Sequence, residues 1–176
     1  LQARIFLTFA VVVVGLVATA VGFILRSESE SLQRETRKRG LAVARSIAWL
    51  STPSLLSYNY VALNQAASRS QEGSEIAYVV IYDKEGMIAA DSRNENAFGH
   101  PPRDAADYVA HAAREENWRF LAPSRPGEPR ILEIFLPVYV QGYAVKWGTV
   151  RIGLSLENVD QEIAALTRHL VLAGIL

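Results

Sequence analysis

Residues 76–92, with the sequence IAYVVIYDKEGMIAADS, read as two short apolar strands joined by a tight turn. The first strand, Ile76–Tyr82, is apolar on both faces, which is typical of a central strand covered on both sides. The DKEG segment that follows has the composition of a turn, with a glycine where a positive φ is required. A simple hairpin register places Tyr78 opposite Asp91, so we expect these two residues on one face of a sheet.

Three later segments complete the predicted sheet, namely Asn117–Ala122, Arg130–Val140 and Trp147–Ser155. In the last two, aliphatic residues alternate with aromatic or polar residues. The aliphatic sides of these two strands coincide in an antiparallel pair when Tyr139 lies opposite Thr149. We therefore expect five antiparallel strands, with an aliphatic face for helix packing and a second face of aromatic and polar groups.

Helical patterns surround the strands, which makes the predicted fold class α+β. Residues 26–50 read as one long helix that becomes amphipathic in its second half. A proline at position 53, preceded by Ser and Thr, is expected to end this helix and to start a second one. The polar segment 93–102 leads to a short helix over residues 104–115, and Glu157–Thr167 is the last predicted helix.

Apolar segments at both ends of the chain point to a membrane. Ile5–Leu25 contains no charged residue, and a bilayer core requires about 20 such residues in a helix. A cleaved signal peptide has a shorter apolar region, so we favour a membrane-spanning helix. The apolar tail Leu170–Leu176 follows Arg168 and is interpreted as the start of a second span, although a terminal core helix is the alternative.

Composition excludes several classes of function. The chain has 18 basic and 18 acidic residues, so no net field attracts nucleic acid. It contains no Cys, which rules out disulfides and thiolate metal sites. Its three His do not share a metal-binding spacing, and neither a nucleophile elbow nor a Gly-rich phosphate loop is present. We expect no catalytic residue, metal or cofactor in this segment.

The order of these features resembles the extracytoplasmic sensor domains of bacterial transmembrane receptors, of the single Cache or PAS-like type. The features that carry the resemblance are the first span, the long helix behind it, YVVIYDKEGMIAADS, FLPVYV, WGTVRIGLS and a helix into a second span. It implies a five-stranded antiparallel sheet with the long helix on one face. It also implies a small-molecule pocket on the other face, covered by Arg93–Glu115.

The resemblance also implies an organisation and a location. The chain would divide into a first transmembrane helix (1–25), a stalk and packing helix (26–50), a sensor core (51–155) and an exit helix with the start of a second span (156–176). Residues 26–168 would lie outside the cytoplasm, in a homodimer of the bacterial inner membrane. The output, a histidine kinase, chemotaxis transducer or nucleotide cyclase, would follow residue 176.

Eight residues are candidates for ligand binding, because the predicted registers or the neighbouring strand and loop bring them to the polar side of the sheet. They are Tyr78, Asp91, His100, Trp118, Arg119, Tyr139, Thr149 and Arg151. Arginine with tyrosine hydroxyls suits a small carboxylate, whereas the aspartate would select an amine or an amino acid. Each residue also has a purely structural interpretation; Arg151, for example, would simply pair with Glu133.

Two functions therefore stay open at this point. One is a ligand-sensing input domain that binds a small polar molecule and relays the signal through its membrane helices. The other is a non-catalytic protein-interaction or dimerisation module without a small-molecule pocket. A membrane-anchored hydrolase would need a nucleophile–base pair that the sequence does not show.

Overall fold

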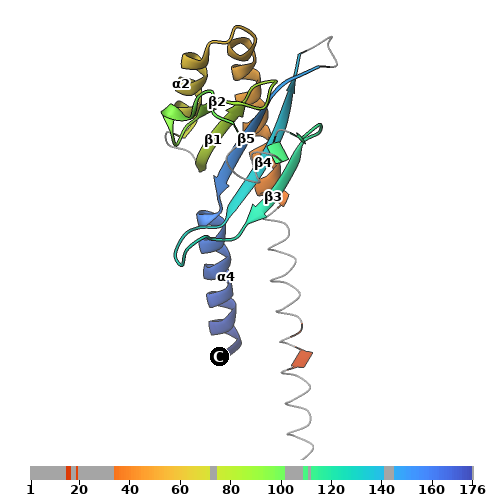
Figure 1. The fold of residues 1–176 in the computed structure, drawn as a ribbon. Helices are drawn as coiled ribbons and strands as arrows, with labels where there is room; N and C mark the ends of the chain where they lie inside the picture. Colours follow the sequence, from red (N-terminus) through yellow and green to blue (C-terminus); the bar gives the residue numbers. More distant parts are fainter. Residues whose placement is uncertain are drawn as a thin grey trace, which may run out of the picture. The chain divides into compact units, whose positions relative to one another are not determined.

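The computed structural model describes residues 15–16, 19, 34–71, 75–101, 109–110, 112–140 and 145–175. The chain separates into two compact units, one of which is Arg37–Glu157 and the other the two terminal segments. The larger unit holds the sheet (Figure 1).

The predicted five-stranded antiparallel sheet is confirmed, and its strand order is β2-β1-β5-β4-β3. The strands are β1 (Ile76–Tyr82), β2 (Ile88–Asp91), β3 (Asn117–Leu121), β4 (Ile131–Tyr139) and β5 (Lys146–Ser155). The helical elements are a helix over residues 34–56, α2 (Tyr60–Gln71), the short η1 (Glu95–Ala97) and α4 (Glu157–Ile175). The predicted strand ends are correct to within one residue for every strand, including β2, which was expected over Met87–Ser92.

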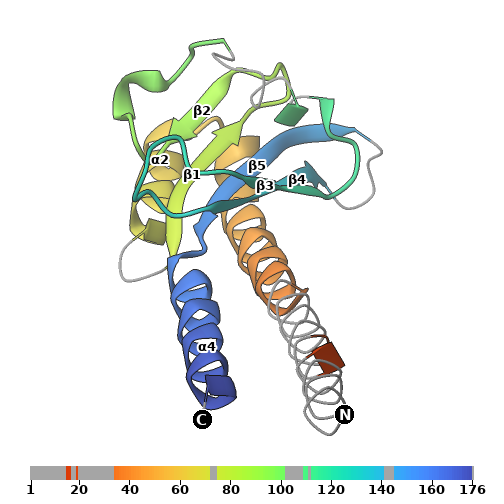
Figure 2. The ribbon, with the colours of Figure 1, turned by 90° about the horizontal axis from the view of Figure 1, so that it is seen from below.

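One face of the sheet is aliphatic and packs against the first helix, as expected. Ile134 pairs with Ile152 on this face, and Leu132 pairs with Leu154. A Cβ atom at Gly40 would lie closer than 3.0 Å to both Leu154 Cδ1 and Ile134 Cδ1. A helix can approach these strands so closely only through a residue without a side chain. In Figure 2 the later part of this helix passes behind the strands.

The opposite face, which we call the polar face, carries a different set of side chains. They are Tyr78, Val80 and Tyr82 from β1, Asp91 from β2, Arg119 from β3, Glu133 and Phe135 from β4, and Thr149 and Arg151 from β5. Most of them are buried, including the charged Glu133 and Arg151.

The predicted β4–β5 register is wrong by two residues, although the faces are right. Tyr139 was expected opposite Thr149 and Pro137 opposite Arg151. In the structure Pro137 lies opposite Thr149, and Phe135 lies opposite Arg151. Alternation distinguishes odd from even positions only, so a shift of two residues leaves every side chain on its face.

The hairpin between β1 and β2 departs from a simple register in the same way. Asp91 lies opposite Val80 instead of Tyr78, because Tyr82 pairs with Ile88 and the register shifts by one further residue between Ile81 and Tyr82. The turn itself is as predicted, with φ of +83° at Gly86. Tyr78 and Val80 are two residues apart on one strand, so Asp91 still shares a face with Tyr78.

The break between the first two helices lies later than predicted. The first helix continues through Pro53 to residue 56, although proline removes the hydrogen bond to the carbonyl four residues earlier. That carbonyl belongs to Trp49, whose side chain is exposed, so water can replace the lost donor. The chain reverses at Tyr58, where φ is +55°, and the Asn59 side chain then caps α2.

The two terminal segments test the membrane predictions only in part, because much of the first segment falls outside the described residues. α4 extends beyond the predicted Thr167 and takes in most of the apolar tail. Within the described residues, no helix combines the length and the hydropathy that a membrane crossing requires. The predicted span Ile5–Leu25 falls outside the described residues except at positions 15, 16 and 19, which are helical. The predicted helix over 104–115 is described from 109 onward, with position 111 excepted, and is helical at 109, 110 and 112.

Candidate functional site

A fully buried carboxylate on β4 lies at the centre of the polar face. Glu133 accepts hydrogen bonds from Tyr78 Oη, from Arg151 Nε at 2.7 Å and from Arg119 Nε at 2.6 Å. Arg151 also forms an ion pair with Glu133 through a terminal nitrogen, and its other terminal nitrogen donates to Tyr82 Oη at 3.3 Å. Burying one charge alone is costly, so the carboxylate and its donors stabilise one another.

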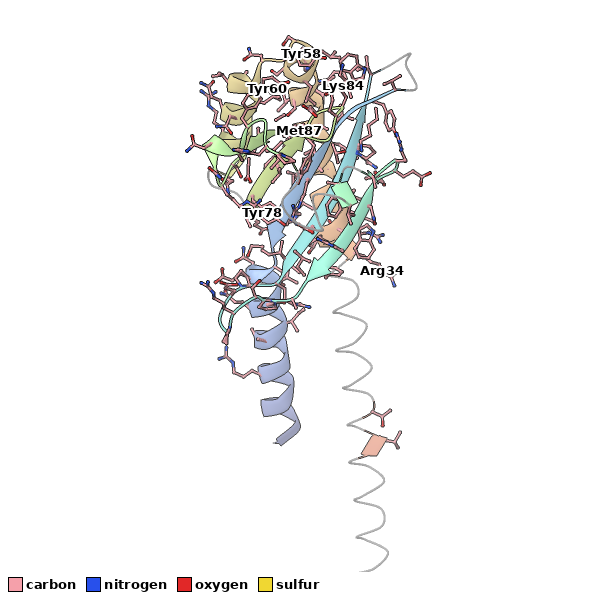
Figure 3. All side chains as sticks on the ribbon, in the orientation of Figure 1. Arg34, Tyr58, Tyr60, Tyr78, Lys84 and Met87 are labelled. Carbon is pink, nitrogen blue, oxygen red and sulfur yellow. The ribbon has the colours of Figure 1, made fainter. Side chains whose placement is uncertain are left out.

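A glycine on β5 makes this arrangement possible. Gly153 lies between Tyr78 on β1 and Glu133 on β4. A Cβ atom at this position would lie closer than 3.0 Å to three atoms of the Tyr78 ring. The ring therefore lies over the glycine, and its hydroxyl reaches across β5 to the carboxylate (Tyr78 is labelled in Figure 3).

The protonation states of the donors are fixed by this environment. Burial raises the pKa of Tyr78 well above its usual value, and the hydrogen bond and negative charge of Glu133 raise it further. Burial alone would lower the pKa of Arg151, but its contacts with Tyr82, Tyr78 and Glu133 raise it overall. Arg151 therefore stays charged, and its guanidinium forms an ion pair with the Glu133 carboxylate.

A second ion pair lies over the Tyr78 ring. The Arg93 backbone N and Nε donate to Asp91 Oδ1 at 3.0 and 3.1 Å, and a terminal nitrogen donates to Oδ2 at 3.2 Å. The Arg93 guanidinium carbon lies 4.3 Å from the centre of the Tyr78 ring, which is within cation–π range. Sequence reasoning missed Arg93, although its position two residues after Asp91, at the start of the predicted covering segment, was a usable signal.

Two residues near the start of β5 donate hydrogen bonds to the carbonyls of Ala110 and Ala113, in the segment between β2 and β3. Thr149 Oγ1 donates to the Ala110 carbonyl at 2.9 Å. Lys146 Nζ donates to the carbonyls of Ala113 at 2.8 Å and Ala110 at 3.3 Å. Burial lowers the pKa of Lys146 to about 8, and the positive charge of Arg114 lowers it further. Lys146 lies just before the predicted strand Trp147–Ser155 and is a second residue that the sequence prediction missed.

The other candidates occupy separate positions. Tyr139 is exposed, and its hydroxyl donates to the Arg114 carbonyl at 2.8 Å, so it also contacts the covering segment. His100 is exposed and is placed by a backbone hydrogen bond in which Ile88 N donates to its carbonyl at 3.0 Å.

Trp118 is not part of the polar face. It pairs with Ile134 and therefore lies on the aliphatic side of β3. Its ring lies 4.9 Å from the guanidinium of Arg37 and packs edge-on against Phe120. Successive strand residues point to opposite faces, so Trp118 and Arg119 cannot both reach one site.

The polar face and the positions beside it gather more positive than negative charge. Among the described residues, its own cations are Arg119 and Arg151 and its carboxylates are Asp91 and Glu133. Arg93, from the loop after β2, and Lys146, at the start of β5, add two cations beside it. No group of three or more His, Cys, Asp or Glu that could bind a metal occurs in the described part of the chain. The chemistry of this face therefore suits an anion.

The chain matches a known protein family and is similar to solved structures. The model of the family described as single Cache domain 3 matches residues 27–168. Among solved structures, the sensor domain of E. coli DcuS is similar with a TM-score of 0.59 and 22% identity, over 76% of this chain and 98% of that one. The sensor domain of the V. cholerae histidine kinase DctB is similar with a TM-score of 0.59 and 18% identity, over 78% of this chain and 55% of that one.

A search of curated protein sequences gives no significant match. The two solved structures support the fold, and the family model covers most of the chain, including the whole sheet and both groups of ion pairs. The chain therefore belongs to the single Cache domain 3 family.

Proposed function

We propose that this chain is the extracytoplasmic input domain of a bacterial inner-membrane receptor and that its polar face binds a small carboxylate. Membership of the Cache family and the likeness to two sensor domains support the sensing role. The excess of cationic side chains on and beside the polar face supports the ligand class. An amino acid is the wider alternative, because Asp91 can accept from an ammonium group.

The arginines at this face differ in how exposed they are and in how many of their N–H donors are already used in hydrogen bonds. Arg151 is buried and bound to both Glu133 and Tyr82. Arg93 binds Asp91 through Nε and one terminal nitrogen, and the side chain is 45% exposed. Guanidinium has five N–H donors, and the second terminal nitrogen of Arg93 has no hydrogen-bond partner among the residues that the structure describes.

Arg119 has the same property at the opposite edge of the sheet. It binds Glu133 through Nε, and its side chain is 38% exposed. Its terminal nitrogens make no hydrogen bond within the part of the chain that the structure describes. A carboxylate that accepts from Arg93 or Arg119 would gain charge-assisted hydrogen bonds without breaking the buried pair.

A binding screen tests this proposal. The 176-residue chain would be titrated by calorimetry with mono-, di- and tricarboxylates, amino acids and amines. We expect a carboxylate among the ligands, and we expect Arg93→Gln or Arg119→Gln to weaken its binding by about tenfold, since a hydrogen bond to a charged group contributes about 1.5–3 kcal/mol.

Arg45→Gln is the matched control, because Arg45 forms an exposed ion pair with Glu116 and is not one of the polar-face cations. Binding of amines alone, or equal loss in all three variants, would contradict the carboxylate assignment.

A second candidate function, pairing of two copies, is favoured by one surface. Ala42, Ser46, Trp49 and Leu50 form a stripe on the helix of residues 34–56, and all four are exposed, Trp49 by 76%. Two copies that join through this stripe would form a two-fold symmetric dimer. Light scattering would show loss of the dimer in Trp49→Glu but not in Val145→Glu, which changes an equally apolar exposed position elsewhere. A chain that is monomeric before mutation would exclude this function.

A further inference from the structure

A second ligand site lies apart from the polar face, in an open groove of about 810 Å³ between α2 and the segment that follows β2. Its lining residues come from the start and the outer side of α2, from β2 and from the turn around η1. They are Tyr58, Asn59, Tyr60, Val61, Asn64, Gln65, Ser68, Arg69, Ala89, Asn96 and Phe98. The volume falls within the range of about 300–1,000 Å³ that is usual for small-molecule sites.

One buried acceptor in this groove lacks a donor. The Oδ1 atom of Asn64 is inaccessible to solvent and has no hydrogen-bond partner in the described part of the chain. Leaving a buried polar atom unpaired is costly, and native structures rarely do so without a reason. Asn64 is one of the lining residues, and rotation of its side-chain amide would turn this acceptor toward the groove, where a bound molecule can supply the donor.

An aromatic surface lies in the same groove. The rings of Tyr60 and Phe98 pack with their centres 4.3 Å apart, and Tyr58 lies 6.2 Å from Tyr60 (both tyrosines are labelled in Figure 3). Phe98 is 51% exposed although it is large and apolar. The face of an aromatic ring carries partial negative charge, so it attracts the C–H groups of a ligand placed on it.

The polar lining is neutral rather than charged. Its side-chain amides belong to Asn59, Asn64, Gln65 and Asn96, and its hydroxyls to Tyr58, Tyr60 and Ser68. Arg69, which is exposed, is the one charged residue among the lining residues. Amides both donate and accept, which matches neighbouring hydroxyl groups that do the same. An anion would find one cation here, against four on and beside the polar face.

We infer that this groove binds a saccharide of one or two rings. A sugar presents an apolar C–H face to the Tyr60–Phe98 pair and hydroxyl groups to the amides, with one hydroxyl donating to Asn64 Oδ1. The site is separate from the carboxylate site, because none of its lining residues belongs to the polar face. A peptide would satisfy the amides too, but it lacks the continuous C–H face that the ring pair fits.

Saturation-transfer NMR tests the inference directly. The 176-residue chain, in a detergent without a sugar headgroup, would be mixed with methyl β-glucoside, methyl β-galactoside, cellobiose or maltose. A sugar concentration of about 10 mM would fill most of a site whose Kd is about 1 mM. We expect saturation of the C–H protons on one face of at least one sugar. The absence of transfer to every sugar, or transfer to a tri-asparagine peptide instead, would overturn the inference.

Two variants locate the site. Phe98→Ala should weaken sugar binding by up to about tenfold, the upper end for loss of an aromatic contact, whereas Phe120→Ala should leave it unchanged. Phe120 is a matched control, since it is also exposed and packs on an aromatic ring, but it lies on β3. Equal effects of the two variants would contradict the assignment.

Asn64→Leu separates a ligand contact from a structural role. It replaces the amide by an apolar group of similar size, so the unpaired acceptor disappears. We expect loss of sugar binding without loss of thermal stability. A chain that binds sugar as before, or that melts at a clearly lower temperature, would contradict the role of Asn64.

Discussion

The position of Gly153 leads to the sharpest test of the polar face, the substitution Gly153→Ala. The new methyl group would lie closer than 3.0 Å to Cε1, Cζ and Cδ1 of the Tyr78 ring. Tyr78 is only 8% exposed, so the ring cannot turn into solvent without losing its packing. It must shift away from β5, and its hydroxyl must leave Glu133.

The expected loss of stability follows from these two effects. Overpacking a filled site costs about 1–3 kcal/mol, and losing a hydrogen bond to a charged group costs about 1.5–3 kcal/mol. The two overlap, because the shift that relieves the contact also breaks the hydrogen bond. We therefore expect the free energy of unfolding to fall by about 3 kcal/mol, measured by denaturant titration with near-ultraviolet circular dichroism.

A double-mutant cycle identifies the cause of this loss. Leucine at position 78 lacks the outer ring atoms, so Gly153→Ala should cost about 1 kcal/mol or less in a Tyr78→Leu background. The control is Gly148→Ala, whose methyl group would meet the backbone oxygen of Tyr82. Its cost should be the same with Tyr78 or with leucine. Equal costs of Gly153→Ala in the two backgrounds would refute the proposed contact.

Three further predictions concern charge, pH and the first helix. Glu133→Gln should lower the free energy of unfolding by about 3–5 kcal/mol in the same titration, because it leaves Arg151 buried without a carboxylate. Stability should rise between pH about 8 and about 10.5, since the lowered pKa of Lys146 lets the folded chain release a proton that the unfolded chain keeps; Lys146→Met should flatten this part of the profile. Pro53→Ala should raise the melting temperature, because proline is the least favourable residue inside a helix, by up to about 3 kcal/mol relative to alanine; an unchanged or lower value would show that Pro53 is needed where it is.

The two faces of the sheet could be predicted from sequence because alternation is a local property. The paired residues Ile131–Val138 of β4 and Gly148–Ser155 of β5 lie on the faces that alternation predicts, including Thr149 and Arg151. The pairing register could not be predicted from alternation, since a shift of two residues leaves the pattern of the two faces unchanged. The irregularity between Val138 and Tyr139 is set by the pairing of whole strands, which a local pattern does not contain.

The site residues were predicted less well than the faces, for two physical reasons. Trp118 and Arg119 were both proposed, although neighbouring strand residues face opposite ways, and only Arg119 reaches Glu133. Arg93 lies beyond the end of β2, where alternation no longer applies and the chain turns back over Tyr78. Loop residues that fold over a face have no periodic signature, so alternation alone could not place this side chain.

The sequence left two roles open for Arg151, ligand contact or partner of Glu133, and the structure shows the second. This pairing changes which residues are suited to sensing. Arg93 follows the end of β2 and Arg119 lies on β3, and these two strands are the edges of the sheet. Arg93 contacts the Tyr78 ring, and Arg119 binds Glu133. A ligand can shift a conformational equilibrium only by binding two states unequally. A carboxylate bound by both arginines would link the two edges, and its affinity would then depend on their separation. The buried Arg151–Glu133 pair would hold the centre of the sheet fixed while the edges respond.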